Sequence, residues 1–162
     1  MTTLVQADLE NAAHAEALLF ILNEYAADIM GGGEKLSDHT RTHLIDELKK
    51  RDTSLIALVF VDEQPAGLAI CFEGFSTFHC APLLNIHDFT IAPTFRGRGL
   101  SKLLLRKIEE LAAERGCTKL TLEVLEGNTI ARKLYENSGF ERYGLDPKMG
   151  KALFYEKKLS AE

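Results

Sequence analysis

Hydrophobic residues recur at helical spacing in two stretches near the start of the chain. One stretch follows Asp8 and continues to about Met30, and the other follows Ser37 and continues to about Lys50. Asp8 and Ser37 are short polar residues of the kind that cap helix N-termini. Before both, Thr2 to Gln6 is rich in β-branched residues. The pattern therefore predicts a short strand followed by two helices.

The middle of the chain changes to patterns that are typical of strands. Ser54 to Val61 is a continuous apolar run, and Ala66 to Phe75 is a second one. The polar residues Asp62 to Pro65 between them predict a hairpin. After a loop from Ser76 to Pro82, Asn85 to Ala92 predicts a third strand, because β-branched and aromatic residues dominate it.

Helical spacing returns in the last third, together with shorter strand patterns. Leu100 begins an apolar helix that ends near Gly116, and Thr118 to Val124 alternates like a strand. Asn128 to Ser138 predicts a short helix. Phe140 to Tyr143 and Leu153 to Leu159 predict a final strand pair. Strands and helices thus mix along the whole chain, which predicts an α/β fold.

Composition restricts the class of protein. The chain has 162 residues, of which 46% are hydrophobic, so we expect a single globular domain over residues 1–162. A net charge of −5 argues against a nucleic-acid partner. The sequence contains no run of about 18 apolar residues, so we expect no membrane partner. The N-terminus lacks the pattern of a signal peptide. The three cysteines and five histidines follow no metal-ligand spacing, so we expect no metal and a cytoplasmic protein with reduced thiols.

A glycine- and arginine-rich loop, Arg96 to Ser101, separates the predicted strand from the Leu100 helix. Glycines before a helix leave backbone N–H groups exposed, and the helix dipole and two arginines add positive charge, so this loop is suited to bind phosphate. It lacks the terminal Gly-Lys-[Ser/Thr] of a P-loop. It also lacks the third glycine of a dinucleotide-binding fingerprint, because Lys102 stands there.

The loop resembles the [QR]-x-x-G-x-[GA] pyrophosphate motif of the GNAT superfamily of acyl-CoA-dependent N-acetyltransferases. Ser101 departs from that motif, where glycine or alanine is usual. A second segment, Asn128 to Phe140, resembles the family pattern N-x-x-A-x-x-x-Y-x-x-x-G-F. The two motifs stand in the family's order, and the resemblance covers about Leu55 to Leu159.

The resemblance implies a mixed, twisted sheet of about six to seven strands with helices on both faces. It also implies acetyl-CoA as cosubstrate. In this family, two N-terminal helices and the mobile loop that joins them form one wall of the acceptor site. Gly31 to Gly33 is such a loop or simply a linker, and both interpretations stay open.

Backbone groups supply most of the cofactor contacts that the resemblance implies. The loop would hold the pyrophosphate, and the strand before it would splay at a bulge and offer bare N–H groups, with that of Ile91 as the oxyanion donor. Asn128 would contact the cofactor, cap its helix, or do both. The expected cofactor-binding residues are Phe89, Thr90, Ile91, Arg96, Gly97, Arg98, Gly99, Leu100, Ser101, Lys102, Asn128 and Tyr135.

Three residues are candidates for proton transfer. By resemblance, Tyr135 is the general acid that protonates the leaving thiolate, although packing of the last helix is the alternative. His87 and Asp88 are candidates for the base, because they lie beside the expected acyl position and histidines titrate near neutral pH. Strand neighbours point to opposite faces, so both can serve only if a bulge turns them.

The expected reaction is transfer of an acetyl group to a small primary amine by direct attack. A weak likeness to the diamine (polyamine) branch and the histidine of the arylalkylamine branch suggest acceptors of those kinds. Acetylation of a protein N-terminus or lysine is an alternative, and a non-catalytic acyl-CoA-binding module is another. Members of this size are often homodimers, so we expect a homodimer here.

Overall fold

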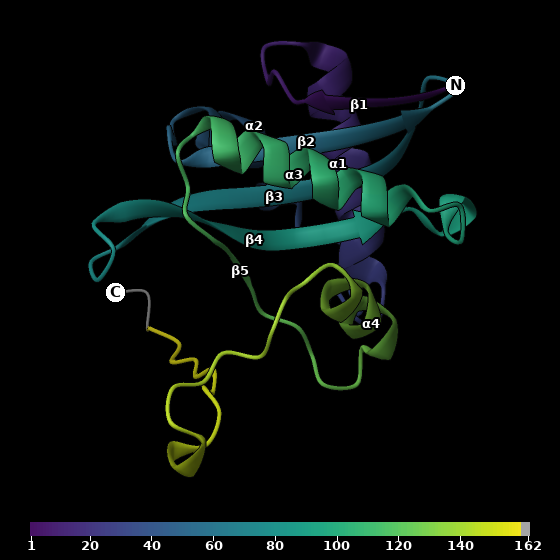
Figure 1. The fold of residues 1–162 in the computed structure, drawn as a ribbon. Helices are drawn as coiled ribbons and strands as arrows, with labels where there is room; N and C mark the ends of the chain where they lie inside the picture. Colours follow the sequence, from purple (N-terminus) through teal and green to yellow (C-terminus); the bar gives the residue numbers. More distant parts are fainter. Residues whose placement is uncertain (160–162) are drawn as a thin grey trace. The chain divides into compact units, whose positions relative to one another are not determined.

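A five-stranded sheet organises the N-terminal part of the chain in a computed structural model that describes residues 1–159 (Figure 1). Its spatial order follows the sequence, β1-β2-β3-β4-β5. The first four strands pair antiparallel, and β5 pairs parallel with β4. The strands are β1 (Thr2–Gln6), β2 (Ser54–Val61), β3 (Gln64–Ser76), β4 (Ala81–Ile91) and β5 (Leu120–Leu122).

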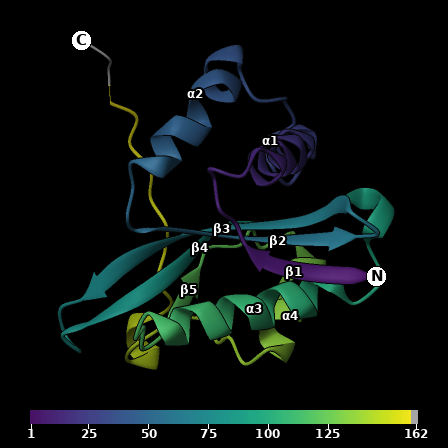
Figure 2. The same cartoon turned by 90° about the horizontal axis from the view of Figure 1, so that it is seen from above.

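Helices cover both faces of this sheet. Helices α1 (Ala12–Ala27) and α2 (Asp38–Lys49) lie on one face, and α3 (Leu100–Glu114) lies on the other (Figure 2). Ser37 caps α2 as predicted, because its hydroxyl accepts the N–H of Thr40 at 3.1 Å. The expected covering of both faces is confirmed.

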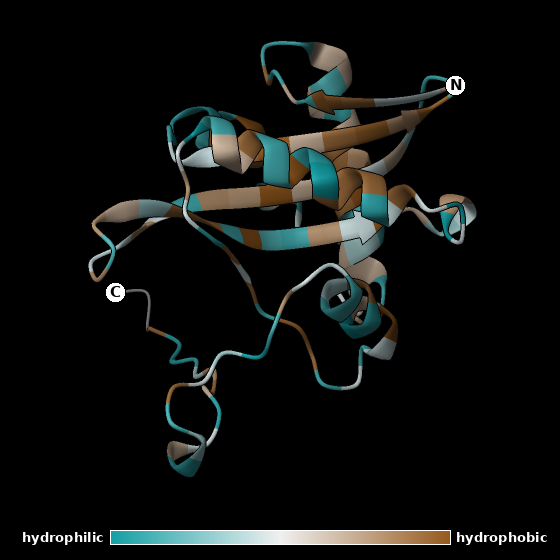
Figure 3. Cartoon of the chain, viewed as in Figure 1, coloured by the Kyte–Doolittle hydropathy of each residue, from teal (hydrophilic) through white to brown (hydrophobic). Residues whose placement is uncertain are grey.

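The two faces of the sheet bury separate sets of apolar residues. On one face, Leu18 of α1 packs in a cluster with Leu58 and Ile70. Because side chains alternate along a strand, Leu55 and Ala69 point to the α3 face, and Ile108 of α3 is fully buried. Strands β2 and β3 are accordingly hydrophobic along most of their length, while α3 shows hydrophilic residues on its outer side (Figure 3). Burial on both faces explains why these two strands are continuous apolar runs in the sequence.

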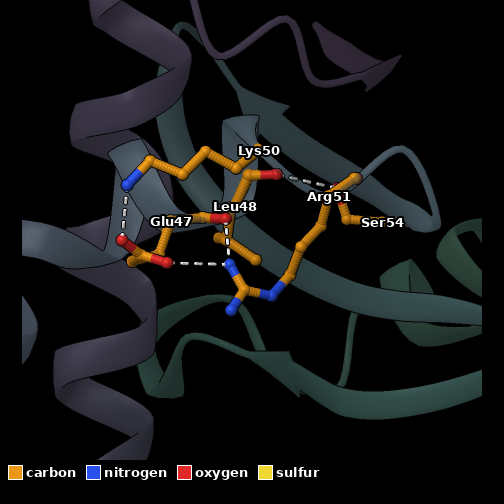
Figure 4. Close-up of polar contacts among 5 residues, drawn as sticks. All are labelled: Glu47, Leu48, Lys50, Arg51 and Ser54. Carbon is orange, nitrogen blue, oxygen red and sulfur yellow. Dashed lines mark hydrogen bonds and ion pairs between the residues drawn. The ribbon is translucent and has the colours of Figure 1, made fainter.

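The end of α2 is held by side chains of its own last turn and of the connection to β2 (Figure 4). Glu47 accepts from Lys50 at 2.7 Å and from Arg51 at 3.0 Å, and the Arg51 guanidinium also donates to the Glu47 carbonyl. The hydroxyl of Ser54 donates to the Leu48 carbonyl at 3.3 Å. The bonds to the Glu47 and Leu48 carbonyls satisfy groups that a helix end otherwise leaves unpaired.

Strand β4 carries an irregularity at His87. Asp88 pairs with Ile70 of β3, but the next β3 residue, Cys71, pairs with Ile86. His87 is therefore the extra residue of a β-bulge. The parallel pairing of β4 with β5 also ends here, at Ile86 and Leu122.

The residues from Glu123 onward form a second compact unit, which we describe by itself. It contains α4 (Thr129–Asn137) and a 3₁₀ turn at Pro147–Met149. Gly139, at φ +87°, ends α4 in the left-handed region. The Phe140 N–H donates to the Tyr135 carbonyl at 3.0 Å, and the Gly139 N–H donates to the Glu136 carbonyl at 3.2 Å. This is the Schellman arrangement of a helix end.

The predicted final strand pair is wrong for the residues that the structure describes. Phe140 belongs to the end of α4, and neither 140–143 nor 153–159 forms a strand. The sheet consequently has five strands in residues 1–159 and not the six or seven expected. Strand-like composition makes a strand only when a partner edge pairs with it.

Several boundaries also differ from the predicted ones. Asp8 does not cap α1: its carboxylate accepts the N–H of Glu10, and Asn11 caps the helix by accepting the N–H of Ala13 at 3.0 Å. The helix ends at Ala27 because Asp28 is already extended. Strand pairing continues beyond the predicted ends of β3 and β4, as far as Ser76 opposite Ala81. By contrast, β5 keeps only the three residues that pair with β4.

The turn between β2 and β3 is tighter than predicted. Asp62 and Glu63 alone connect the strands, with φ values of +48° and +67°. Two left-handed residues form the turn that matches the twist of a two-residue hairpin. Gln64 and Pro65, expected in the turn, therefore belong to β3.

No helix among residues 1–159 is both long enough and apolar enough to cross a membrane.

Candidate active site

The bulge in β4 brings His87 and Asp88 to the same face of the sheet. Asp88 pairs with Ile70, which packs in the core cluster beneath α1 and α2. His87 contacts Phe72, which packs against the same cluster. Regular alternation would have sent these neighbours to opposite faces. The extra residue at the bulge removes that constraint, so both candidate bases lie on the side of α1 and α2.

The two side chains have different surroundings. The imidazole of His87 is exposed and stands edge-on to the ring of Phe72, with centroids 5.5 Å apart. Asp88 is half-buried, and this burial raises the pKa of its carboxyl, an effect that the neighbouring His87 partly offsets. A half-buried carboxyl with a raised pKa next to an accessible imidazole is typical of proton-transfer sites.

Tyr25, near the end of α1, packs against the same core cluster on this side of the sheet. Burial raises the pKa of its phenol, and the negative charges of Asp88 and Asp28 raise it further. Tyr25 is half-buried and packs against the core cluster. The residue thus lies within electrostatic reach of a strand carboxylate and of a carboxylate at the end of its own helix.

The last residues of β4 turn alternate backbone groups toward the two edges of the strand. The Ala92 N–H donates to the Ala66 carbonyl at 2.9 Å, so the peptide groups of every second residue, including Thr90, face β3. Those of Phe89 and Ile91 consequently face away from β3. Thr90 is buried, with 7% of its surface exposed, and it pairs with Leu68. Ile91 therefore directs its N–H to the edge along which pairing with β5 has already ended.

The loop after β4 has the backbone of an anion site. Gly97 and Gly99 take φ values of +77° and +76°, which glycine adopts without strain. Gly99 is the N-cap of α3, and its carbonyl accepts the first helical N–H groups, those of Lys102 at 3.2 Å and Leu103 at 3.4 Å. The N–H groups of Leu100 and Ser101 precede these, in the first turn where a helix offers no carbonyl partner.

The loop also has room and positive charge. A Cβ atom at Gly97 or Gly99 would meet no atom within 4 Å. The guanidinium of Arg98 lies 5.2 Å from the centre of the Phe95 ring and donates to the Thr94 carbonyl at 3.3 Å, so it is held close to the loop. Open space, convergent N–H groups and basic side chains fit a pyrophosphate. Small Ser101, half-buried in the first turn, is compatible with this use.

Arg96 has side-chain contacts that the motif did not predict. Its Nε donates to the Ile91 carbonyl at 3.0 Å, and its Nη2 donates to the Asp28 carboxylate at 3.1 Å. Arg96 thus joins the loop to the end of β4 and to the end of α1.

The remaining two predicted residues lie in the second unit. The Asn128 side chain accepts the N–H of Ala131 at 3.2 Å, which confirms its prediction as a helix cap. Tyr135 is buried, with 7% of its surface exposed, and its ring centre lies 5.7 Å from that of Phe140. Contact between the first and last positions of a Schellman end is typical. Tyr135 and Gly-Phe at 139–140 therefore have a structural part in ending α4.

Three residues of this site were not identified from the sequence. Tyr25 and Phe72 looked like ordinary core positions, and only the fold brings them to the bulge. Asp28 did carry a signal: an acidic residue at a helix C-terminus is unfavourable with the helix dipole and indicates a compensating partner. Among residues 1–159, no three His, Cys, Asp or Glu side chains gather as the ligands of a metal ion would.

Comparison with known proteins gives the family. Residues 17–140 match the Acetyltransferase (GNAT) family. The chain is 29% identical to a thialysine N-epsilon-acetyltransferase of Caenorhabditis elegans over 129 residues, which cover 76% of this chain and 74% of the relative.

Solved structures share the fold. A structure described as a probable acetyltransferase superposes with a TM-score of 0.79 at 23% identity, covering 99% of both chains. The aminoglycoside acetyltransferase AAC(6')-Iy, in complex with the bisubstrate analog CoA-S-monomethyl-acetylneamine, has a TM-score of 0.75 at 19% identity, covering 98% of this chain and 99% of that one. The chain belongs to the GNAT family and is an acetyl-CoA-dependent N-acetyltransferase.

Proposed function

We propose that this protein acetylates a small primary amine by direct attack of the amine on acetyl-CoA, with His87 or Asp88 as the base. The observation that carries the proposal is the bulge in β4, which turns both side chains to one face close to the end of the strand. A protonated amine must lose a proton before it can attack, so a base must lie beside the reacting carbonyl.

His87 is the preferred base, and Asp88 assists it. The exposed imidazole can exchange its proton with solvent, whereas Asp88 is half-buried. The carboxylate of Asp88 stabilises positive charge on its neighbour, which is the usual part of the acidic partner of a histidine base. The accessible imidazole thus takes the proton, and the half-buried carboxylate stabilises the resulting charge.

The loop from Arg96 to Ser101 would hold the pyrophosphate of acetyl-CoA, with the N–H groups of Gly97 to Lys102 as donors. Bound acetyl-CoA supplies the thioester carbonyl that is attacked and the thiolate that leaves. The Ile91 N–H would donate to the carbonyl oxygen as negative charge builds on it, since it faces the edge of β4 away from β3. Phe89 and Thr90 would line the cofactor arm, and Asn128 would contact the cofactor while it caps α4.

Tyr135 is proposed as the general acid for the thiolate. Its position in the Asn128 to Phe140 motif supports this role, and its burial is compatible with a hydroxyl held in one place. The packing role at the end of α4 does not compete with it, because packing uses the ring and acid catalysis uses the hydroxyl.

A small cationic amine is the proposed acceptor. Asp88 and the phenol of Tyr25 are an acidic and aromatic pair that suits an ammonium group. The likeness to a thialysine acetyltransferase supports a compact amine on a flexible chain. Polyamine- and arylalkylamine-like acceptors share that chemistry. Acetylation of a protein N-terminus or lysine, and acyl-CoA binding without catalysis, are the alternatives.

Release of free CoA from acetyl-CoA, scored against a panel of amines, tests the proposal. The panel would hold diamines of increasing length, thialysine, lysine, phenylethylamine, neamine, and peptides with a free N-terminus or a single lysine. Mass spectrometry would locate the acetyl group on each product. We expect the small amines to give the highest kcat/KM.

Turnover of peptides alone would replace the small-molecule proposal with protein acetylation. Tight binding of acetyl-CoA, measured by calorimetry, together with no acetylated product would favour the binding module.

Residues 1–162 as one domain and a homodimeric state are further proposals that follow from the resemblance. Light scattering at micromolar concentration would test the second. A mass equal to one chain of 18.0 kDa would contradict it.

A further inference from the structure

Asp28 organises the turn that follows α1. Its carboxylate accepts the N–H of Met30 at 3.0 Å, and its carbonyl accepts the N–H groups of Gly31 at 2.8 Å and Gly33 at 3.0 Å. The other carboxylate oxygen accepts from Arg96 at 3.1 Å. The glycine turn is therefore built on the oxygen atoms of one residue.

The turn is folded tightly against the last turn of α1. A Cβ atom at Gly31 would overlap the carbonyl oxygen of Tyr25, so only glycine allows this approach. Glu34 continues the contact, since its N–H donates to the Ala26 carbonyl at 3.1 Å. Any displacement of the turn would consequently act on the helical turn that carries Tyr25.

Arg96 compensates the charge of Asp28. A carboxylate at a helix C-terminus is unfavourable with the helix dipole, and the last turn of α1 contains no basic residue. The Met30 N–H and the Arg96 guanidinium lower the pKa of Asp28, so the carboxylate is ionised. The partner lies 68 residues away in the sequence, in the loop proposed to hold pyrophosphate.

Arg96 and Asp28 connect three segments of the chain near the bulge. Arg96 also donates to the carbonyl of Ile91, the last residue of β4, at 3.0 Å. Tyr25 lies within electrostatic reach of Asp28 on its own helix and of Asp88 on β4. The loop, the end of β4 and the end of α1 are thus joined by one guanidinium and one carboxylate.

We propose that Asp28 is a positioning residue that acts through Arg96. It couples the phosphate loop to the glycine turn and to Tyr25, so that a cofactor held on the loop strengthens binding of the amine. This inference rests on the proposed function, in which the loop holds acetyl-CoA and the amine binds near Tyr25 and Asp88.

Two variants break the pair in different ways. Asp28→Asn keeps an oxygen for the Met30 N–H, but it replaces the oxygen that accepts from Arg96 with an NH2 group, so the negative charge and the bond to Arg96 are lost together. Arg96→Gln is compatible with the loop motif, which accepts glutamine at this position, and cannot form the ion pair. Lys107→Gln is the matched control, because it breaks an ion pair with Glu110 on the outer side of α3. Thermal melting would establish that each variant is folded.

The first measurement is steady-state kinetics at saturating acetyl-CoA. The ion pair is partly exposed, so we expect its loss to raise the KM for the amine about two- to fivefold. The kcat of Asp28→Asn should stay close to its original value, because Asp28 does not touch the reacting atoms. Lys107→Gln should leave both constants unchanged.

The second measurement is hydrogen exchange at the amides of residues 30–33, with and without CoA. In the unaltered protein, CoA should slow exchange at these amides, although they lie outside the loop. Asp28→Asn and Arg96→Gln should abolish this slowing, whereas Lys107→Gln should keep it. A structural role alone would change exchange without making it depend on CoA.

The outcomes separate this inference from the proposed function. A protein that acetylates amines, but whose two variants keep the amine KM and the CoA-dependent slowing, would overturn the coupling alone. A protein that neither binds acetyl-CoA nor acetylates any amine would overturn the proposed function and the coupling with it. If one of the two variants fails to fold, the other still tests the coupling.

Discussion

The imidazole of His87 stands edge-on to the ring of Phe72, with 5.5 Å between centroids and 77° between planes. Edge-to-face packing of this kind is favourable and restricts rotation of both rings. The bulge brings His87 to this face, and Phe72 orients it, while the imidazole stays exposed. An oriented and accessible imidazole is what a base needs before its substrate arrives.

Replacement of this imidazole should reduce turnover. We expect His87→Gln to lower kcat about a hundredfold, the smaller end of the range for acid–base catalysis, because Asp88 remains. The affinity for acetyl-CoA, measured by calorimetry, should not change. His79→Gln is the control, since His79 is hydrogen-bonded to Ser76 in an exposed loop. Equal turnover in His87→Gln and the original protein would shift the base assignment to Asp88.

Asp88 should make folding stability depend on pH in a defined direction. Its folded-state pKa is raised, so its contribution to stability is present below the ordinary aspartate pKa and is lost as the pH rises through the folded value. Asp88→Asn, which stays neutral, should therefore raise Tm at pH 7, on the order of a few degrees. The difference should shrink as the pH falls toward about 4. A lower Tm for Asp88→Asn at pH 7 would contradict this expectation.

Two glycines at opposite ends of α3 offer a matched test of the phosphate loop. Gly99 and Gly116 have φ values of +76° and +72°, and a Cβ atom would meet open space at either. Glutamate at either position should cost a similar stability, about 1–2 kcal/mol, because both sites are left-handed. Only Gly99→Glu should also weaken acetyl-CoA binding, by about tenfold or more, since it adds negative charge where phosphate would bind.

Calorimetric titration of both folded variants measures this difference. Unchanged acetyl-CoA affinity in Gly99→Glu would remove the loop from the cofactor site. An equal loss of affinity in Gly116→Glu would show that the effect is not local.

Tyr135→Phe should separate the hydroxyl from the ring. The ring contact with Phe140 at the end of α4 should survive, so stability and acetyl-CoA affinity should change little. Turnover should fall, by about a hundredfold or more if the hydroxyl is the general acid. Gly139→Ala is the structural control: it strains the left-handed end of α4 and should lower stability by about 1 kcal/mol. Full turnover in Tyr135→Phe at every pH would make water the proton donor.

The three cysteines should react with thiol reagents in order of exposure. Burial raises the pKa of Cys71 to about 12, so almost no reactive thiolate exists at pH 8. Burial and the charge of Glu73 also raise the pKa of half-buried Cys117. Timed alkylation followed by peptide mass spectrometry should find Cys80 modified first and Cys71 modified only after unfolding. Early modification of Cys71 would show that β3 opens in the native protein.

Local signals in the sequence were sufficient for most elements of the first 122 residues. β2 matches its predicted bounds, since a run buried on both faces needs no knowledge of its partners. Ser37 and Asn128 cap their helices as predicted, because a cap forms within three residues of the chain. The signal for the loop proposed to bind phosphate is equally local, because its glycines, its arginines and the helix after it are contiguous.

Features that depend on distant partners were missed or wrong. The strands predicted at 140–143 and 153–159 had suitable composition but no partner in the described chain. The family resemblance led us to expect a bulge in this strand, but its position at His87 depends on the register between β3 and β4, which the residues of β4 do not specify alone.

Asp28 and Arg96 show most clearly the difference between what local sequence predicts and what depends on distant partners. Each residue has a local signal, Arg96 in the loop motif and Asp28 at a helix end, but neither signal identifies the other residue as its partner. They meet across 68 positions because α1 packs on the sheet that contains β4. Short-range spacing determines helices, turns and phosphate loops, because neighbouring residues are necessarily close in space. Which charges meet, and which face a side chain takes, depends on the packing of elements that the chain brings together only on folding.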